Sequence, residues 1–396
     1  MHIAILSTSY PLKRGTSSGI FVSRLVDALP DSLDKTVITP CPDFPVQPEM
    51  HTGVNIKCFR YAPRRWQRLA HGPGGIPVAL RRQRWLILLL PLLVLSMLLS
   101  CIRVARRTDL IHANWSLNGL TAGIAGKLTS TPVITTLRGS DVSRLEHSLI
   151  SRLLLHGCLL TNCRVVAVNN AIKDAVCTLY PRYSRRVVTI PNGVDDAFLA
   201  IAAGDNRKDG TTRITSIGNL NPNKGMHTIL EALPLLANNP GISLRIVGDG
   251  PDRDRLQSMA ADIANDTIRI DLPGSKDPDE IPSVLADTDI FILASLAEGR
   301  PNVVLEAMAS GRPVLASDID GVRELITHED TGLLFTVDDP ASLATQLERL
   351  LNDRELCARI GQAARHFITS NQLNWARCAG SYQALYRTCL QGTAAA

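Results

Sequence analysis

The sequence is poor in features that mark several classes of protein. Only 4% of its 396 residues are aromatic, and its nine cysteines are scattered, without a C-x2-C pair or an even framework. Such cysteines indicate reduced thiols in a cytosolic protein, not a disulfide scaffold. The nine histidines never take a metal-ligand spacing such as H-E-x-x-H, so the sequence predicts no metal site.

Two further absences bear on location and partners. The opening MHIAILSTSY leads directly into an apolar strand and lacks the form of a signal peptide, so we expect a cytoplasmic protein. From Arg60 to Arg107 there is no Asp or Glu, although the formal charge of the whole chain is only +5. Clustered arginines with few aromatics and no nucleic-acid motif favour phospholipid, not nucleic acid, as the anionic partner. The stretch contains ten of them: Arg60, Arg64, Arg65, Arg68, Arg81, Arg82, Arg84, Arg103, Arg106 and Arg107.

What the chain does have is an ordinary globular composition, 45% hydrophobic and 20% charged. Its length allows two domains of roughly 150–200 residues each. Apolar strands alternate with helical segments throughout. This pattern predicts an α/β fold made of two Rossmann-like domains.

The most informative stretch is 289–317, DIFILASLAEGRPNVVLEAMASGRPVLAS. Its apolar run Ile290–Leu293 predicts a buried parallel strand. Asn302–Ser310 predicts a helix with Pro301 as its first residue, and Val314–Ala316 predicts the next strand. In such strand–loop–helix units, ligands bind at the loop that leaves the strand.

Polar groups in this unit have the chemistry of a phosphate and sugar site. Glu298 lies in the loop, and Glu306 stands inside an otherwise apolar helix. The amides of Asn302, Val303 and Val304 at the helix start, if free, would suit a phosphate. The stretch is therefore a candidate ligand site.

The same stretch resembles the retaining nucleotide-sugar glycosyltransferases of the GT-B fold, glycosyltransferase family 4. Their signature has two glutamates with seven residues between them, in E-G-x-P-N-V-V-L-E-A-M-A-x-G-x-P-V, and 298–314 matches it nearly residue for residue. The resemblance implies that Glu298 touches the donor sugar and phosphate, and that Glu306 holds the ribose hydroxyls. The alternative is that Glu306 merely pairs with a basic neighbour such as Lys224.

The resemblance extends with gaps from about residue 3 to 370 and implies the whole architecture. In the GT-B fold, two Rossmann-like domains face each other across a cleft. On this basis we expect an acceptor-side domain at 1–191 and a nucleotide-sugar-binding domain at 192–370. The remaining segment, 371–396, is expected to form a helix that crosses back to the first domain.

Further donor-binding residues follow from the same resemblance. The glycine loop that ends at Gly19 would face the donor phosphates, and Lys224 matches the lysine that holds the diphosphate. Asn219 stands where the family has an arginine, and the loss of a charged hydrogen bond there costs on the order of 1.5–3 kcal/mol. Arg138 or Arg300 would be needed to compensate. The other candidates are Gly218 and Gly248, with Leu272 and Lys276 expected to read the base.

The first domain departs from the family at a second position. Where the family usually has His-Gly-x-Asp, the sequence has LRGSD at 137–141, so Arg138 replaces the histidine while Asp141 remains. Arginine has five donors and keeps its charge, so it can bind a hydroxyl or phosphate but cannot accept a proton. We take Arg138 and Asp141, together with Glu298, as the catalytic candidates.

Residues 85–102 are apolar except for two serines and are flanked by Arg82, Arg84 and Arg103. Their length is at the threshold for a membrane-spanning helix. A span would leave little chain to rejoin the sheet, because 109–115 looks like one of its strands. We expect instead a helix on the membrane surface, with the arginines on anionic headgroups. The alternatives are a fully buried core helix and a true span.

Together these features predict a metal-independent, retaining hexosyltransferase-type enzyme that uses a UDP- or GDP-sugar. Because the segment 60–107 belongs to the acceptor-side domain, we expect a lipid-linked or oligosaccharide acceptor. This places the enzyme on the inner face of the cell membrane, in surface polysaccharide biosynthesis. One alternative is a catalytically silent membrane scaffold, favoured by Asn219 and Arg138. Another is an NAD enzyme around Gly248, but Arg253 stands where the third glycine is needed, so no cofactor is expected.

Overall fold

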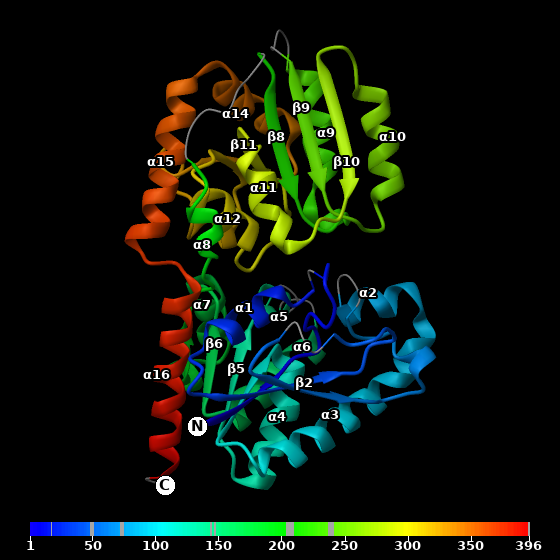
Figure 1. Cartoon of the computed structure of the whole chain (residues 1–396), viewed down its shortest axis with the longest axis vertical. Helices are drawn as coiled ribbons and strands as arrows, with labels where there is room; N and C mark the ends of the chain where they lie inside the picture. Colours follow the sequence, from blue (N-terminus) through cyan, green and yellow to red (C-terminus); the bar gives the residue numbers. More distant parts are fainter. Residues whose placement is uncertain are drawn as a thin grey trace. The chain divides into compact units, whose positions relative to one another are not determined.

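The computed structural model describes residues 1–16, 18–47, 51–71, 75–142, 145, 148–202, 210–236 and 241–394. The chain forms two compact units (Figure 1). The N-terminal unit comprises Met1–Asn192 and Trp375–Ala396, and the C-terminal unit comprises Gly193–Asn374. The predicted boundaries were 191/192 and 370/371. Each unit contains one parallel sheet with helices packed on it, so the predicted α/β fold of two Rossmann-like domains is confirmed.

The N-terminal unit is built on a seven-stranded parallel sheet in the order β3-β2-β1-β4-β5-β6-β7. Because β1 lies between β2 and β4, the strand order reverses at β1, and the loops after β1 and β4 leave the sheet side by side. The strands are β1 (His2–Leu6), β2 (Asp34–Pro40), β3 (Val54–Phe59), β4 (Leu110–Asn114), β5 (Val133–Leu137), β6 (Arg164–Ala167) and β7 (Val187–Thr189).

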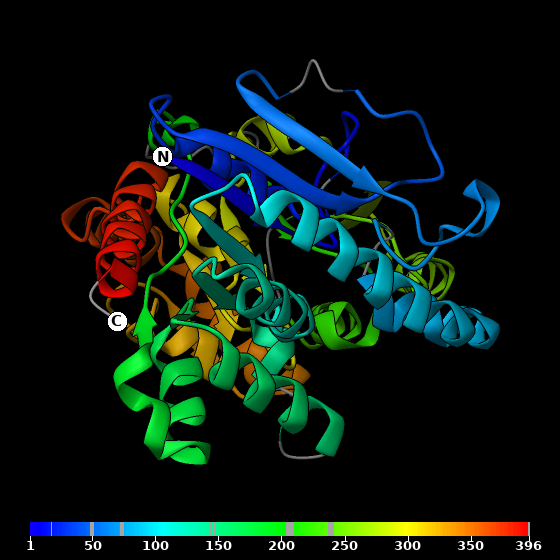
Figure 2. The same ribbon diagram turned by 90° about the horizontal axis from the view of Figure 1, so that it is seen from below.

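Alternate residues of these strands pack against different helices. Ile3 and Ile5 join a core cluster with α1 (Ile20–Ala28) and α16 (Trp375–Ala394), whereas Ala4 and Leu6 join a cluster with α3 (Leu90–Ala105) and α4 (Ser116–Thr129). Figure 2 shows α3, in cyan, running along the blue strands. The remaining helices are α2 (Gly75–Arg82), α5 (Gly139–Val142), α6 (Leu149–Thr161) and α7 (Asn170–Leu179), with the 3-10 turns η2 (Arg64–Trp66), η3 (Arg84–Leu89) and η4 (Pro181–Arg186).

The last helix, α16, is fixed to the N-terminal sheet by a buried polar network. His112, inside β4, meets the Tyr386 hydroxyl at 2.8 Å through Nδ1 and the Thr136 hydroxyl at 2.8 Å through Nε2. The Tyr382 hydroxyl lies 2.8 Å from the same Thr136 oxygen, and its ring stacks on His112 with centroids 4.9 Å apart. Burial lowers the pKa of His112 to about 3, so the imidazole is neutral. Two tyrosines of α16 are thus anchored to one histidine in the middle of the sheet.

The C-terminal unit is built on a six-stranded parallel sheet in the order β10-β9-β8-β11-β12-β13. The order reverses at β8, which lies between β9 and β11. The strands are β8 (Thr212–Ile217), β9 (Ile242–Val247), β10 (Ile268–Gly274), β11 (Ile290–Leu293), β12 (Val314–Ser317) and β13 (Leu333–Phe335). The helices are α8 (Asp196–Leu199), α9 (Met226–Ala232), α10 (Arg253–Ile263), α11 (Ile281–Ala286), α12 (Asn302–Ala309), α13 (Asp320–Arg323), α14 (Pro340–Asn352) and α15 (Arg354–Ser370).

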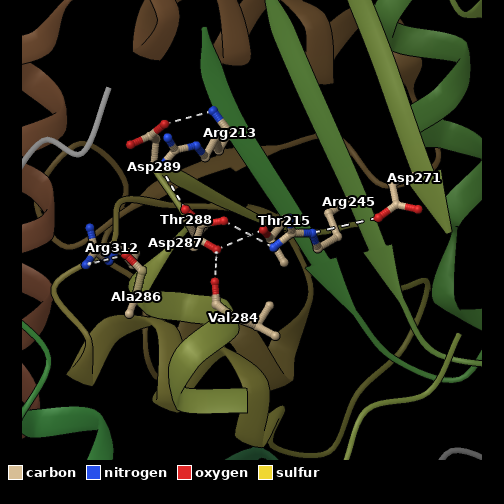
Figure 3. A network of polar contacts seen from close by, with 10 residues as sticks. All are labelled: Arg213, Thr215, Arg245, Asp271, Val284, Ala286, Asp287, Thr288, Asp289 and Arg312. Atoms are coloured by element: carbon tan, nitrogen blue, oxygen red, sulfur yellow. Dashed lines mark hydrogen bonds and ion pairs between the residues drawn. The ribbon is translucent and has the colours of Figure 1, made fainter. Parts of the chain in front are cut away.

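A polar network joins β8 to β11 near the amino-terminal ends of these two strands (Figure 3). The Arg213 backbone amide donates to Asp289 at 2.8 Å, and its guanidinium donates to Asp287 at 2.8 Å. Arg245 reaches the other oxygen of Asp287 at 3.3 Å. The ion pairs are partly exposed and individually weak, but they add to the strand pairing. The loops at the opposite, carboxyl ends of β8 and β11 are thereby held next to each other.

Candidate functional site

Lys224 and Glu298 come together at the switch point of the C-terminal sheet. Lys224 follows β8 and Glu298 follows β11, so their loops leave neighbouring strands at the position where α/β sheets bind ligands. Lys224 Nζ lies 2.5 Å from Glu298 Oε1, and the Ser295 hydroxyl donates to the same oxygen at 2.8 Å. The two side chains are only 21% and 15% exposed, which strengthens their attraction. The structure therefore pairs Lys224 with Glu298, whereas the alternative considered from the sequence paired it with Glu306.

The loops that carry Lys224 and Glu298 touch through their backbones. Gly225 has φ +58°, and a Cβ there would lie 2.0 Å from the carbonyl oxygen of Ala294. The Asn223 side chain donates to the Ala297 carbonyl at 2.9 Å, and the Asn223 carbonyl accepts from Leu296 at 2.8 Å. Sequence reasoning missed Asn223 and Ser295, since only the pairing of the two loops reveals their partners.

Gly218 and Gly248 also lie at this edge, directly after the neighbouring strands β8 and β9. Gly248 has φ +150°, and a Cβ there would lie 1.9 Å from the Gly218 carbonyl oxygen. The Gly218 amide donates to Val247 at 3.0 Å. The structure thus brings these two predicted donor-binding glycines into contact, and the lack of a side chain at Gly248 is what lets the loops pack. Asn219 is exposed in the same loop.

The start of α12 differs from the prediction in two details. Pro301 has extended backbone angles, φ −73° and ψ 107°, so it precedes the helix and is not its first residue. Its carbonyl accepts from the Val304 amide at 3.1 Å, so this one of the three predicted phosphate-binding amides is already engaged. Asn302, Val303 and Glu306 are half-buried, and their spacing puts them on one side of the helix.

Leu272 and Lys276, the residues expected to read the base, contact other residues of the C-terminal unit. Leu272 lies within β10, and its half-buried side chain packs against the core. Its carbonyl accepts from Arg253 at 3.0 Å. Lys276 follows β10 and pairs with Glu280 at 3.1 Å on the surface. Both residues are half-buried, and the contact predicted between each of them and the base remains a prediction.

Arg300, one of the two arginines expected to compensate for Asn219, is held inside the C-terminal unit. Its side chain is 5% exposed and lies 4.0 Å from the Glu324 carboxylate. Its compensation for Asn219 remains a prediction.

Arg138, the other candidate, is buried in the N-terminal unit. Its guanidinium donates to Asn192 at 2.7 Å and to Asn114 at 2.9 Å, and it lies 4.3 Å from the centre of the Phe21 ring. Burial lowers the pKa of this guanidinium. Asn114 ends β4 and Asn192 follows β7, so Arg138 ties together distant strand ends. It serves here as a structural junction, and both asparagine partners were missed from the sequence.

Asp141 is also satisfied within its own unit. One carboxylate oxygen accepts from the amide and the hydroxyl of Ser116, both at 2.8 Å, and the other accepts from the Arg138 amide at 2.8 Å. Burial raises the pKa of Asp141, although these hydrogen bonds act in the opposite direction. The carboxylate fixes the first residue of α4 and the entry to α5, which makes it a positioning residue.

Gly19 stands at the start of α1, close to the loop after β1. It has φ +77°, and a Cβ there would lie 2.1 Å from the Ser9 carbonyl oxygen. The glycine is therefore required for close packing of these two segments. Its predicted contact with donor phosphates remains a prediction.

The apolar segment around residues 85–102 forms η3 and α3, whose inner side packs against the sheet and whose outer side is exposed. The alternative of a fully buried core helix is therefore wrong. Arg84–Ala105 is long and apolar enough to cross a membrane, but its inner side is covered by its own unit. The buried residues are Leu86, Leu89, Leu93, Met97, Cys101 and Ala105; the exposed ones are Trp85, Ile87, Leu88, Leu92, Leu95 and Leu99.

Comparison with known proteins identifies the family. Residues 19–198 match the sequence model described as Glycosyltransferase Family 4, and residues 200–367 match the one described as Glycosyl transferases group 1. Between them the matches span both units. The chain belongs to glycosyltransferase family 4. Its transferase class is thereby established, and the predicted resemblance is confirmed.

Several relatives are 24–34% identical to this glycosyltransferase over the aligned parts of the two chains. The UDP-Gal:alpha-D-GlcNAc-diphosphoundecaprenol alpha-1,3-galactosyltransferase of Escherichia coli is 29% identical over 263 residues, 63% of this chain and 67% of that protein. The phosphatidyl-myo-inositol mannosyltransferase of Mycolicibacterium smegmatis is 34% identical over 206 residues, 51% of this chain and 52% of that protein.

Solved structures confirm the GT-B fold of this glycosyltransferase. Anabaena HepE in complex with UDP and glucose superposes with a TM-score of 0.75 at 20% identity, covering 98% of this chain and 100% of that one. Sucrose-phosphate synthase from Thermosynechococcus elongatus superposes with a TM-score of 0.78 at 20% identity, covering 99% and 100%. At this identity the likeness concerns the fold alone.

Proposed function

We propose that this glycosyltransferase moves a sugar, with retention of configuration, from a nucleoside diphosphate-sugar to a lipid-linked glycan. The observation that carries the donor half of the proposal is the contact between Lys224 and Glu298 at the sheet's switch point. Both side chains are mostly buried, and the two loops that carry them contact each other. The lysine can bind a diphosphate, and the carboxylate can bind sugar hydroxyls.

The proposed mechanism assigns a separate task to each group. The acceptor hydroxyl attacks from the face that the diphosphate leaves, and the departing diphosphate takes the proton. Lys224 and the start of α12 neutralise the negative charge that grows on the diphosphate. Glu298 positions the sugar and stabilises positive charge at the reacting carbon. No protein base is needed, which fits an arginine at position 138.

UDP-sugars are the first donors to test. HepE was solved with UDP and glucose and with UDP-glucose, and the E. coli relative is named for UDP-Gal. A donor that binds only the folded state raises the apparent melting temperature, by an amount that grows with the logarithm of its affinity. A panel of UDP- and GDP-sugars screened by thermal shift would therefore reveal the donor.

Lys224→Ala is expected to weaken binding of that donor by about 10–100-fold, since a charged hydrogen bond to phosphate contributes about 1.5–3 kcal/mol. Isothermal calorimetry measures the effect. Lys57→Ala, at an exposed lysine of β3 in the N-terminal unit, is the control. If no nucleotide sugar stabilises or binds the wild type, the catalytically silent scaffold is favoured instead.

The acceptor half of the proposal rests on the outer side of α3. Its exposed leucines border a shallow, open apolar surface lined by Ile87, Leu90, Pro91, Val94, Leu95 and Leu98. Ten arginines and no acidic residue occur from Arg60 to Arg107. Two relatives are named for lipid-linked acceptors, a diphosphoundecaprenol sugar and a phosphatidylinositol. We infer a peripheral enzyme on the inner face of the cell membrane, in surface polysaccharide biosynthesis.

A variant with Leu92→Ser, Leu95→Ser and Leu99→Ser is expected to lose most of its binding to anionic vesicles. These leucines are exposed, whereas Leu93 faces the core and is unsuitable for such a test. Flotation with phosphatidylglycerol vesicles at low salt measures the bound fraction, which should also fall as salt rises. Leu235→Ser, an equally exposed leucine of the C-terminal unit, is the matched control. A wild type that never floats would refute the membrane role.

A further inference from the structure

The exposed apolar surface of the N-terminal unit continues beyond α3. Among the described residues, all but three of the large exposed apolar side chains lie between positions 66 and 160; the three are Leu179, Leu235 and Leu296. Those outside η3 and α3 are concentrated on two helices. They are Ile124 and Leu128 on α4, and Leu149, Ile150, Leu153 and Leu160 on α6.

On α6 the exposed residues form one stripe. Leu149, Leu153 and Leu160 follow the spacing i, i+4 and i+11, which puts them on one side of the helix. Leu149 is 75% exposed, whereas Leu155 and Leu159 are fully buried against the sheet. The helix therefore repeats the arrangement of α3, with one apolar side in the core and another in solvent.

The three helices form one layer on the same side of the N-terminal sheet. α4 packs between α3 and α6. It approaches α6 so closely that a Cβ on Gly157 would lie 2.8 Å from Leu120, and one on Gly119 would lie 2.7 Å from the Cys158 sulfur. Because all three helices pack on the same face of the sheet, their outer sides point away from it together. The exposed stripes of α3 and α6 thus flank the one on α4.

The charges around α6 also match those around α3. Neither α3, α4 nor α6 contains an Asp or Glu. Beside α6 lies η4, which exposes Arg182, Arg185 and Arg186. The Tyr180 ring next to η4 stacks on His156 of α6 with centroids 5.4 Å apart, and its hydroxyl donates to the α6 backbone at 2.8 Å. An apolar stripe bordered by arginines therefore occurs twice on one face.

We propose that α6 is a second membrane-contacting helix, and that α3, α4 and α6 together present one apolar face to an anionic bilayer. This inference rests on the membrane role proposed above and extends it to a separate helix. The charges favour a bilayer over a second copy of the chain, because two copies joined face to face would bring like-charged arginine clusters near each other. Acyl chains would cover the leucines, and lipid phosphates would meet the arginines of η4.

The test compares two variants of the full chain in flotation with vesicles of phosphatidylglycerol and phosphatidylcholine. The first carries Leu149→Ser, Leu153→Ser and Leu160→Ser, and the second carries Arg182→Glu, Arg185→Glu and Arg186→Glu. Each is expected to bind at least about ten-fold more weakly than the wild type while α3 is intact. Leu235→Ser again serves as the control. Because the arginine variant leaves the apolar residues unchanged, it keeps the test valid if the serine variant does not fold.

The outcomes separate the two proposals. If the wild type floats and both α6-side variants float equally well, α6 does not contact the membrane, although the role of α3 stands. If the wild type itself does not float, the membrane role and this inference both fail. Size-exclusion chromatography of the same variants tests whether a second copy of the chain covers this face instead. A dimer that is lost on leucine substitution, with flotation unchanged, would assign the face to that second copy.

Discussion

Glu298→Ala is expected to transfer sugar about 10²–10³ times more slowly than the wild type, the effect typical of removing one preorganised charged group from an active site. The substitution removes the carboxylate that holds Lys224 at 2.5 Å and accepts from Ser295 at 2.8 Å. Both the placement of the lysine and the charge facing the sugar are lost. Initial rates of donor hydrolysis and of transfer measure the change.

Two further variants make the Glu298 result interpretable. Glu298→Gln keeps the size and one acceptor oxygen but removes the charge, so a loss similar to that of alanine would assign the effect to charge. Glu231→Ala changes an exposed glutamate of α9 and should leave the rate unaltered. Wild-type rates in Glu298→Ala would refute the role proposed for this residue.

The N-terminal unit is expected to lose about 2 kcal/mol of unfolding free energy through His112 as the pH falls from 6.5 to about 5. Burial holds the pKa of His112 near 3 in the folded chain, against 6.5 for a free imidazole, and the nearby Arg138 charge acts in the same direction. The folded state therefore binds the proton more weakly than the unfolded state. The stability is present at neutral pH and is lost as the pH falls below 6.5.

Tryptophan fluorescence is the suitable probe for this pH dependence. All four tryptophans, Trp66, Trp85, Trp115 and Trp375, lie in the N-terminal unit, so urea unfolding followed at their emission reports on this unit. His112→Gln is expected to be less stable at neutral pH, because two buried hydroxyls lose a partner, but its stability should fall less between pH 6.5 and 5. His366→Gln, at an exposed histidine of α15, is the control. Equal slopes for wild type and His112→Gln would contradict the argument.

Local patterns in the sequence were sufficient for the fold. The apolar run at Ile290–Leu293 is β11, and the strand predicted at Val314–Ala316 is β12, which runs one residue further. These predictions succeed because continuous apolar runs and their flanking glycines and prolines act over a few residues. Short-range patterns do not predict the exact start of a helix. The sequence could not show that Pro301 is extended and that its carbonyl accepts from the Val304 amide.

The sequence predicted only part of the candidate site. The motif at 298–314 pointed to both glutamates and to the family. The match to the family's diphosphate-binding lysine pointed to Lys224. The motif around 137–141 suggested that Arg138 and Asp141 face a substrate, and the hydrogen bonds that the structure gives these two side chains lie within their own unit. Their partners, Asn114, Asn192 and Ser116, come from other strands and helices. No short-range pattern encodes such contacts.

The sequence by itself thus determined the family, the two α/β domains and the identity of the paired charges, because motifs and periodicity act along the chain. The tertiary structure decided which groups meet and which surfaces stay uncovered. Lys224 meets Glu298, and His112 meets Tyr386, only because parallel strands bring distant segments together. The apolar composition of α3 and α6 does not say which side faces solvent. Packing on one face of the sheet decides that, since only the side turned toward the strands can be buried.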